Sequence, residues 1–339
     1  MRGGPTVVVD ADVLGRHRTG DETYVANLLA ELGRLAADLR LVALTRRPDL
    51  VPPGIEAFEM PGRRQELRMA VGVPRALRQL RPALVHFQYA LPPRLRAPAV
   101  VTVHDLSFER DPGVMNRLDR ITFRTVVPGA VRRAARVLTV SERTKRDLVE
   151  LYGVDEAKVV VTPNGVDPAF SPGGDHDAHS YALFVGAIQP RKDPLAALAA
   201  ATEAGLPLVV AGPERDRRLA QELRAQGADL RGYVSQDELI ALYRGAAAVV
   251  LPSRYEGFGL PVLEAMATGT PVVATMDDAV REVAGDAAVY ASPAGLGDAL
   301  RRAVADRDRL GAAGLEQARR FTWAETARRT LAVYCEVLG

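Results

Sequence analysis

The feature of this 339-residue sequence that most limits its fold is a regular alternation of short, β-rich apolar runs with longer helical stretches. Alternation of this kind is typical of parallel sheets whose strands are joined by crossover helices. It occurs in two blocks, separated by a polar stretch at residues 171–180 that contains Pro172, Gly173 and Gly174. We interpret that stretch as an interdomain linker, since the chain is long enough for two domains of ordinary size.

The apolar runs predict strands on both sides of this linker. In the first block they are Thr6–Asp10, Leu41–Leu44, Leu84–Phe87, Val100–His104, Val137–Val140 and Val159–Thr162. In the second block they are Tyr181–Gly186, Leu208–Ala211, Val249–Leu251, Pro271–Ala274 and Ala288–Tyr290. We therefore expect two doubly wound α/β domains, at residues 1–170 and 181–321.

Helices are expected between the strands. Examples are Thr23–Leu35, Asn116–Arg133 and Glu142–Tyr152, the last with Ser141 as its N-cap. A further helix at 322–339 has apolar residues at nearly helical spacing, and we expect it to cross back onto the first domain.

Composition and charge exclude several classes of protein. Apolar residues make up 47% and charged residues 25%, which is ordinary for a globular chain. A net charge of +2 gives no reason to expect nucleic acid as a partner. No apolar run is long enough to span a membrane, and the single cysteine, Cys335, excludes an intrachain disulfide.

The N-terminal residues run directly into the first strand, so we expect no signal peptide and a cytoplasmic protein. Peripheral contact with the inner face of the membrane is the alternative. It depends on Arg64, Arg68, Arg75 and Arg78, which would share one face of a continuous helix. A solvated helix face is the simpler interpretation.

The most informative segment runs from Pro252 to Val273. A strand ends, a glycine-rich loop follows, and Pro261 stands where the first turn of a helix tolerates proline. Glycines let the backbone approach a ligand closely, and a helix N-terminus offers N–H groups to anionic oxygens. Glu256 in the loop and Glu264 in the helix would lie on the order of 10 Å apart. That spacing suits two hydroxyl-rich ends of one elongated ligand better than a proton-transfer pair.

This stretch resembles the Glu-x7-Glu signature of the family-4 retaining glycosyltransferases of the GT-B fold. The resemblance implies two Rossmann-like domains that face a central cleft. It also implies that Glu256 hydrogen-bonds the hydroxyls of the donor sugar and that Glu264 binds the ribose of the nucleotide. Phe258, Gly259 and Leu260 would offer backbone N–H groups near the sugar and the phosphate.

A second matching segment, from Val185 to Asp193, follows the first strand of the second domain. Family members place cations here for the donor diphosphate, which gives that role to Arg191 and Lys192 and puts Gly186 among the substrate-binding residues. Lysine is rare in this chain, with three among 44 basic residues, so its use here suits a need for a compact ammonium group. Many members have an arginine directly after the glycine; this chain has Ala187, and Arg191 is the candidate replacement.

Weaker matches extend the resemblance over nearly the whole chain. His104 ends a strand of the first domain, as the histidine of the family's His-Asp pair does, and would lie over the donor sugar near the scissile bond. Gly20, in an N-terminal loop, is the candidate for close approach to the donor. Val234 would frame the nucleotide base. The segment Pro163–Asp167 matches a hinge motif, which we interpret as structural.

The resemblance implies a hexosyltransferase that uses a nucleotide diphosphate sugar, either GDP-mannose or a UDP-hexose. The sugar would pass to a hydroxyl of a sugar, a lipid-linked sugar or a small molecule, in polysaccharide or glycoconjugate biosynthesis. Anomeric configuration would be retained by front-face attack, with Arg191 and Lys192 holding the leaving group. A non-catalytic nucleotide-sugar-binding protein and a GT-B sugar-nucleotide epimerase are the alternatives.

We expect no cofactor and no metal ion. Asp10 and Asp12 have the spacing of a metal-binding Asp-x-Asp motif, but they come directly after the first strand, far from where the other large glycosyltransferase fold places that motif. The segment Asp175–His179 has ligand-type side chains, and we interpret it as solvated linker.

Overall fold

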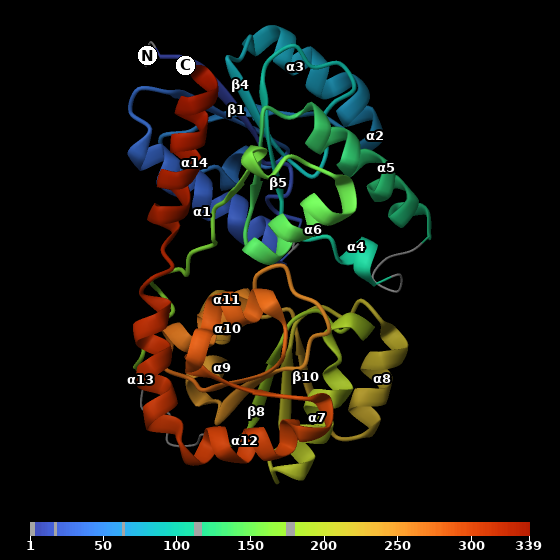
Figure 1. Ribbon diagram of the computed structural model, residues 1–339, viewed down its shortest axis with the longest axis vertical. Helices are drawn as coiled ribbons and strands as arrows, with labels where there is room; N and C mark the ends of the chain where they lie inside the picture. Colours follow the sequence, from blue (N-terminus) through green and yellow to red (C-terminus); the bar gives the residue numbers. More distant parts are fainter. Residues whose placement is uncertain (1–3, 17–18, 63–64, 112–116, 174–179) are drawn as a thin grey trace. The chain divides into compact units, whose positions relative to one another are not determined.

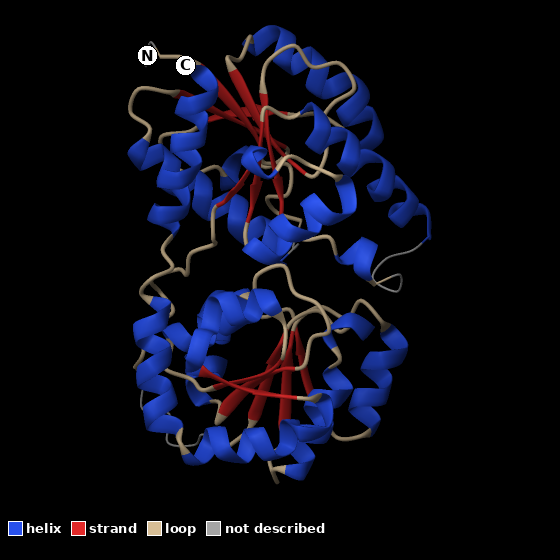
Figure 2. Ribbon diagram, in the orientation of Figure 1, coloured by secondary structure: helices blue, strands red, loops and turns tan. Residues whose placement is uncertain are grey.

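The computed structural model describes residues 4–16, 19–62, 65–111, 117–173 and 180–339. The chain divides into two compact units, each built around its own sheet (Figures 1 and 2). Unit 1 comprises Met1–Leu106, Arg117–Gly165 and Thr322–Gly339, and unit 2 comprises Ser107–Asn116 and Val166–Phe321. Residues 174–179 of the expected linker lie outside the described residues.

Unit 1 contains a seven-stranded parallel sheet in the order β3-β2-β1-β4-β5-β6-β7. Its strands are β1 (Thr6–Asp10), β2 (Arg40–Thr45), β3 (Glu56–Glu59), β4 (Leu84–Gln88), β5 (Ala99–Val103), β6 (Arg136–Thr139) and β7 (Val159–Val161). Its helices are α1 (Thr19–Leu35), α2 (Gln65–Leu67), α3 (Val73–Leu80), α5 (Arg117–Arg133), α6 (Glu142–Tyr152) and α14 (Trp323–Leu338). The strand order reverses between β1 and β4, the place where such sheets bind ligands.

Unit 2 contains a six-stranded parallel sheet in the order β10-β9-β8-β11-β12-β13. Its strands are β8 (Ala182–Val185), β9 (Leu208–Ala211), β10 (Asp229–Gly232), β11 (Ala248–Leu251), β12 (Val272–Thr275) and β13 (Ala288–Ala291). Its helices are α4 (Ser107–Arg110), α7 (Pro194–Glu203), α8 (Arg217–Ala225), α9 (Gln236–Gly245), α10 (Leu260–Ala267), α11 (Asp278–Ala284), α12 (Leu296–Ala305) and α13 (Arg307–Ala318). Helices cover both faces of the sheet, so its central strands are buried throughout (Figure 2).

The predicted fold class is confirmed, and every predicted strand is present with small shifts at its ends. Ser141 is the N-cap of α6, and its side chain accepts a hydrogen bond from the N–H of Thr144. The sequence analysis missed two strands, β3 and β10. Both lie at the edge of a sheet and expose much of their length, so they lack the apolar run that marks a buried strand.

Helix α14 packs along α1 and is part of unit 1 (Figure 1). The hydroxyl of Tyr334 lies 2.6 Å from Nδ1 of His86 on β4, and the hydroxyl of Thr326 donates to the carbonyl oxygen of Pro163. A side chain at Gly165 would meet the backbone of Trp323 at 2.0 Å. The Pro163–Asp167 segment therefore has a structural reason for its glycine.

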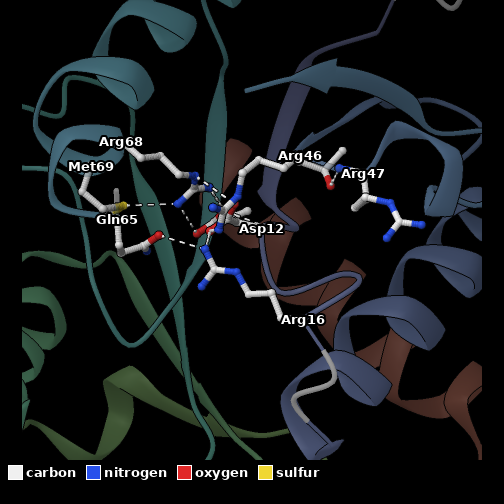
Figure 3. A network of polar contacts seen from close by, with 9 residues as sticks. Asp12, Arg16, Arg46, Arg47, Gln65, Arg68 and Met69 are labelled. Carbon is white, nitrogen blue, oxygen red and sulfur yellow. Dashed lines mark hydrogen bonds and ion pairs between the residues drawn. The ribbon is translucent and has the colours of Figure 1, made fainter. Parts of the chain in front are cut away.

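Two local predictions are wrong. Gly20 lies in the first turn of α1, which begins at Thr19, and not in a loop. The arginines of residues 64–78 do not form one exposed face, because Arg68 is buried. It contacts Asp10 and points toward Asp12, the latter visible in Figure 3. A π-helical segment, Arg68–Gly72, separates α2 from α3, and its first residue, Arg68, is buried. Arg64 lies outside the described residues. No helix within the described ranges is both long enough and apolar enough to cross a bilayer.

Candidate functional site

In unit 2, the loop between β11 and α10 places the side chain of Glu256 in the interior of the protein. Gly259 caps α10 with a φ of +101°, a left-handed conformation that favours glycine, and Pro261 follows in the first turn. Glu256 is buried, and its backbone N–H donates to Oδ2 of Asp277 at 3.2 Å. Asp277 in turn caps α11, so the loop is fixed to the neighbouring helix.

Two cations face Glu256. Nζ of Lys192 lies 2.5 and 2.7 Å from its two carboxylate oxygens, and Nη1 of Arg191 lies 3.8 Å from Oε2. Arg191 also donates to the carbonyl oxygen of Tyr255. Burial raises the pKa of the Glu256 carboxyl, but Lys192 and Arg191 outweigh burial and bring that pKa below its ordinary value. Glu256 is therefore ionised, and the cluster carries a surplus positive charge.

The loop after β8 places the two cations. Gly186 has a φ of +152°, and a side chain at Gly212, after β9, would meet the carbonyl oxygen of Gly186 at 2.0 Å. The two glycine loops therefore pack backbone against backbone. Arg191 and Lys192 follow on a single 3₁₀ turn, Pro190–Lys192, and Asp193 ends it in the left-handed conformation while capping α7. The short turn presents both cations to the loop that carries Glu256.

Glu264 lies on α10, in a different environment. Oε2 of Glu264 accepts a hydrogen bond from the hydroxyl of Tyr243 at 2.7 Å, and Tyr243 is fully buried on α9. Burial raises the pKa of the Glu264 carboxyl to about 7, with a further rise from Asp167, while the Tyr243 hydrogen bond lowers it. This carboxyl titrates near neutral pH, unlike that of Glu256.

The remaining predicted residues of unit 2 lie at the carboxyl ends of its strands. Phe258, Gly259 and Leu260 form the entry to α10. The N–H groups of Val262 and Leu263 donate to the carbonyl oxygen of Gly259, so the N–H groups that could serve a ligand are those that precede Pro261. The Phe258 ring is buried and packs against Phe321. Val234 follows β10 and is half-buried, next to Ser235, the N-cap of α9.

His104 and Gly20 belong to unit 1. His104 directly follows β5, is buried, and lies with its Nε2 3.1 Å from Oε1 of Gln88. Burial lowers the pKa of His104, and the negative charges of Asp21 and Asp105 oppose that effect in part. Arg191, Lys192 and Glu256 therefore form one cluster, Glu264 lies beside Tyr243, and His104 has a separate environment in the other unit.

The sequence analysis missed three residues that hold these side chains, namely Gln88, Tyr243 and Asp277. Asp277 had a readable signal, since an aspartate after a strand and before a helix is a typical N-cap. Gln88 and Tyr243 had none, because their partners lie 16 and 21 residues away on other elements.

The two aspartates considered as metal ligands are held by arginines. Arg16, Arg46 and Arg68 point toward Asp12 (Figure 3), and Arg68 also contacts Asp10. Within the described ranges, no group of three or more His, Cys, Asp or Glu side chains is arranged to hold a metal ion. The segment Asp175–His179 lies outside those ranges.

Comparison with known proteins agrees with this arrangement. Residues 18–170 match the model of Glycosyltransferase Family 4, and residues 172–320 match that of Glycosyl transferases group 1. The O-antigen chain mannosyltransferase B of Escherichia coli is 29% identical over 87% of this chain and 82% of its own length. A D-inositol 3-phosphate glycosyltransferase of Nocardioides sp. is 38% identical over 56% of this chain, which spans only 51% of that relative. Sucrose-phosphate synthase of Thermosynechococcus elongatus superposes with a TM-score of 0.81 at 19% identity, over 98% of this chain and 99% of its own.

The fold and the two family matches define a two-unit enzyme of the GT-B class that transfers sugars. The chain belongs to the family-4 glycosyltransferases.

Proposed function

We propose that this glycosyltransferase moves a hexose from a nucleotide diphosphate sugar to an acceptor hydroxyl, with retention at the anomeric carbon and without a metal ion. The observation that carries the proposal is the cluster of Lys192, Arg191 and Glu256 beside the start of α10. Two cations and the N-terminus of a helix next to an ionised carboxylate suit a ligand that joins a diphosphate to a sugar.

In this proposal the diphosphate replaces Glu256 as the ion-pair partner of Lys192 and Arg191. The released carboxylate accepts hydrogen bonds from sugar hydroxyls, and Glu264 accepts them from the ribose. The bond between the anomeric carbon and the diphosphate oxygen breaks, and the acceptor oxygen bonds to that carbon from the same face. The acceptor proton passes to the departing diphosphate, whose developing charge is stabilised by the cations already in place.

The relatives suggest which substrates to try first. The name of the Escherichia coli relative specifies a mannosyltransferase, which puts GDP-mannose ahead of the UDP-hexoses. The name of the Nocardioides relative specifies an inositol phosphate, which makes a phosphorylated cyclitol one acceptor to test beside free and lipid-linked sugars.

A donor panel tests the proposal. Wild-type protein is incubated with GDP-mannose, UDP-glucose, UDP-N-acetylglucosamine and UDP-galactose, with and without EDTA, and nucleotide release is measured with each acceptor. We expect one donor to be used in the presence of EDTA, and Glu256→Gln and Glu264→Ala to lower kcat/KM by at least about a hundredfold. Glu238→Gln, on the exposed face of α9, is the matched control. Binding without turnover over the whole panel would overturn the proposal and favour a nucleotide-sugar-binding protein. An inverted anomeric product would overturn retention.

A further inference from the structure

His104 is held by side chains of unit 1 to which the proposed function gives no role. Oε1 of Gln88 lies 3.1 Å from its Nε2. The ring of Tyr24, on α1, meets the imidazole edge to face at a centroid distance of 4.7 Å, and the ring of Tyr89 lies at 5.6 Å. Gln88 ends β4 and pairs in register with Thr102 of β5, two residues before His104. Neighbouring strands and a helix thus fix the ring on several sides.

Only one end of the Gln88 amide makes a hydrogen bond among the described residues, and that bond is to His104. Because an amide oxygen can only accept, Nε2 of His104 carries the ring proton in this arrangement. The amide nitrogen of Gln88 is buried and has no hydrogen-bond partner among the described residues. An unmade hydrogen bond of this kind costs stability, and the contact with His104 is the one polar contact of the Gln88 side chain that the described residues show.

Tyr89 adds backbone strain at the same place. Its φ is +57°, in the left-handed region that residues other than glycine seldom occupy. Its hydroxyl accepts a hydrogen bond from the N–H of Asp105 at 3.2 Å, directly after His104. Within the described ranges only three residues other than glycine have a positive φ, and another of them, Asp193, follows Lys192. Strain of this kind persists where the surrounding structure enforces it, and it is concentrated at functional sites.

The groups that face His104 leave its ring uncharged. Burial lowers the pKa of His104, against the negative charges of Asp21 on α1 and Asp105. His86, on β4, has a pKa lowered to about 3 by burial and by His104, so it brings no charge near neutral pH. The two tyrosine rings are neutral as well, and Gln88 supplies an acceptor without adding a negative charge.

We propose that Gln88 is a positioning residue for His104: with the rings of Tyr24 and Tyr89, it holds the imidazole neutral and in one orientation for the transfer reaction. This inference rests on the proposed function, because it requires a transfer reaction that depends on His104. Gln88 acts through His104 and touches no reacting atom.

Kinetics over a range of pH test the inference. The full chain is assayed from about pH 5.5 to about pH 9 with the donor that the wild type uses, as wild type, Gln88→Ala and Gln88→Glu. We expect Gln88→Ala to lower kcat about tenfold, the factor that corresponds to one hydrogen bond, with the donor KM within about twofold of the wild type. In Gln88→Glu a carboxylate faces Nε2 and stabilises the imidazolium. The pKa of His104 should therefore rise, and kcat should be lost at acidic pH and recovered at alkaline pH. Gln79→Glu makes the same charge change on an exposed position of α3 and should leave the profile unchanged.

An NMR titration, which needs no turnover, tests the positioning of His104 by Gln88 separately from the role of His104 in the reaction. The imidazole C–H signal of His104 is assigned by NMR with His104→Gln and followed against pH in the wild type and both Gln88 variants. A pKa that rises in Gln88→Glu supports the inference; an unchanged His104 titration together with wild-type kcat in Gln88→Ala overturns it. If His104→Ala itself turns over like the wild type, the reaction does not depend on His104 and the inference fails, whereas the proposed function, which rests on the cluster of Lys192, Arg191 and Glu256, still stands. Circular dichroism shows whether each variant is folded, so a loss of fold is not read as a loss of positioning.

Discussion

Each unit holds buried carboxylates and basic side chains at the carboxyl ends of its strands, and the two clusters differ in which force dominates. In unit 1, Asp10 and Asp12 face Arg16, Arg46 and Arg68. Burial raises the pKa of the Asp10 carboxyl more than Arg68 lowers it. The planar guanidinium groups of the three arginines pair with the aspartates, and Arg16 also contacts Gln65 (Figure 3).

The cluster of unit 2 has the same surplus of one positive charge, but the cations dominate there. The pKa of Glu256 is lowered despite its burial, because Lys192 and Arg191 outweigh the loss of solvent. Lys192 is a point charge on a flexible stem and stands on a single 3₁₀ turn. In the proposed function, it exchanges the carboxylate of Glu256 for a phosphate of the donor. The two clusters therefore have the same net charge, and the cluster proposed to bind the donor differs in that its cations outweigh burial.

The largest effect is expected from a substitution that breaks the cluster of unit 1. Arg68→Met leaves two carboxylates buried with less compensation, so the free energy of unfolding should fall by about 3–5 kcal/mol. Urea unfolding measures it. Arg75→Met, on the exposed side of α3, is the control and should change stability by no more than about 0.5 kcal/mol. Adding Asp10→Asn to Arg68→Met should recover part of the loss, and equal stability of wild type and Arg68→Met would contradict a structural role.

Glu264 extends the comparison to a half-buried carboxyl that receives a hydrogen bond from Tyr243. Its folded pKa is about 7 and its ordinary value 4.5, so between these pH values the folded state binds more protons than the unfolded state. The free energy of unfolding should therefore fall as pH rises through that window, by on the order of 3 kcal/mol from this group. Glu264→Gln removes the titration. Its stability relative to the wild type should rise between about pH 5 and about pH 8, whereas Glu238→Gln should show a constant difference. A pH-independent difference for Glu264→Gln would contradict the raised pKa.

Much of this arrangement could be predicted from the sequence because it is local. One short segment contains the glycine loop with Glu256 and the start of α10 with Pro261 and Glu264. The central strands were readable because burial on both faces makes them continuous apolar runs. What could not be predicted depends on partners far along the chain: Arg68 meets Asp10 across 58 residues, and Lys192 meets Glu256 across 64. The sequence shows which side chains carry charge, but only the fold shows which of those charges cancel.

Lys192→Met tests the cluster of unit 2 through binding and not through stability. The variant keeps Arg191 near Glu256 but loses the cation nearest to the carboxylate. We expect kcat/KM for the donor to fall about a hundredfold, which corresponds to about 2.7 kcal/mol, because a preorganised positive charge at the leaving group is lost. Lys158→Met, whose ammonium contacts a backbone carbonyl in unit 1, should leave kcat/KM unchanged. A wild-type value for Lys192→Met would place the diphosphate elsewhere.

The smallest expected effect concerns an ion pair with ideal geometry but no burial. Arg40, at the start of β2, makes a bidentate contact with Glu56 of the edge strand β3, at 2.8–3.0 Å. Both side chains are exposed, so solvent screens the pair and Arg40→Gln should cost only about 0–1 kcal/mol by urea unfolding, less at high salt. If this variant were as destabilised as Arg68→Met, the number of contacts and not burial would decide what such clusters contribute. A small, salt-sensitive loss would leave desolvation as the factor that makes the cluster of unit 1 structural.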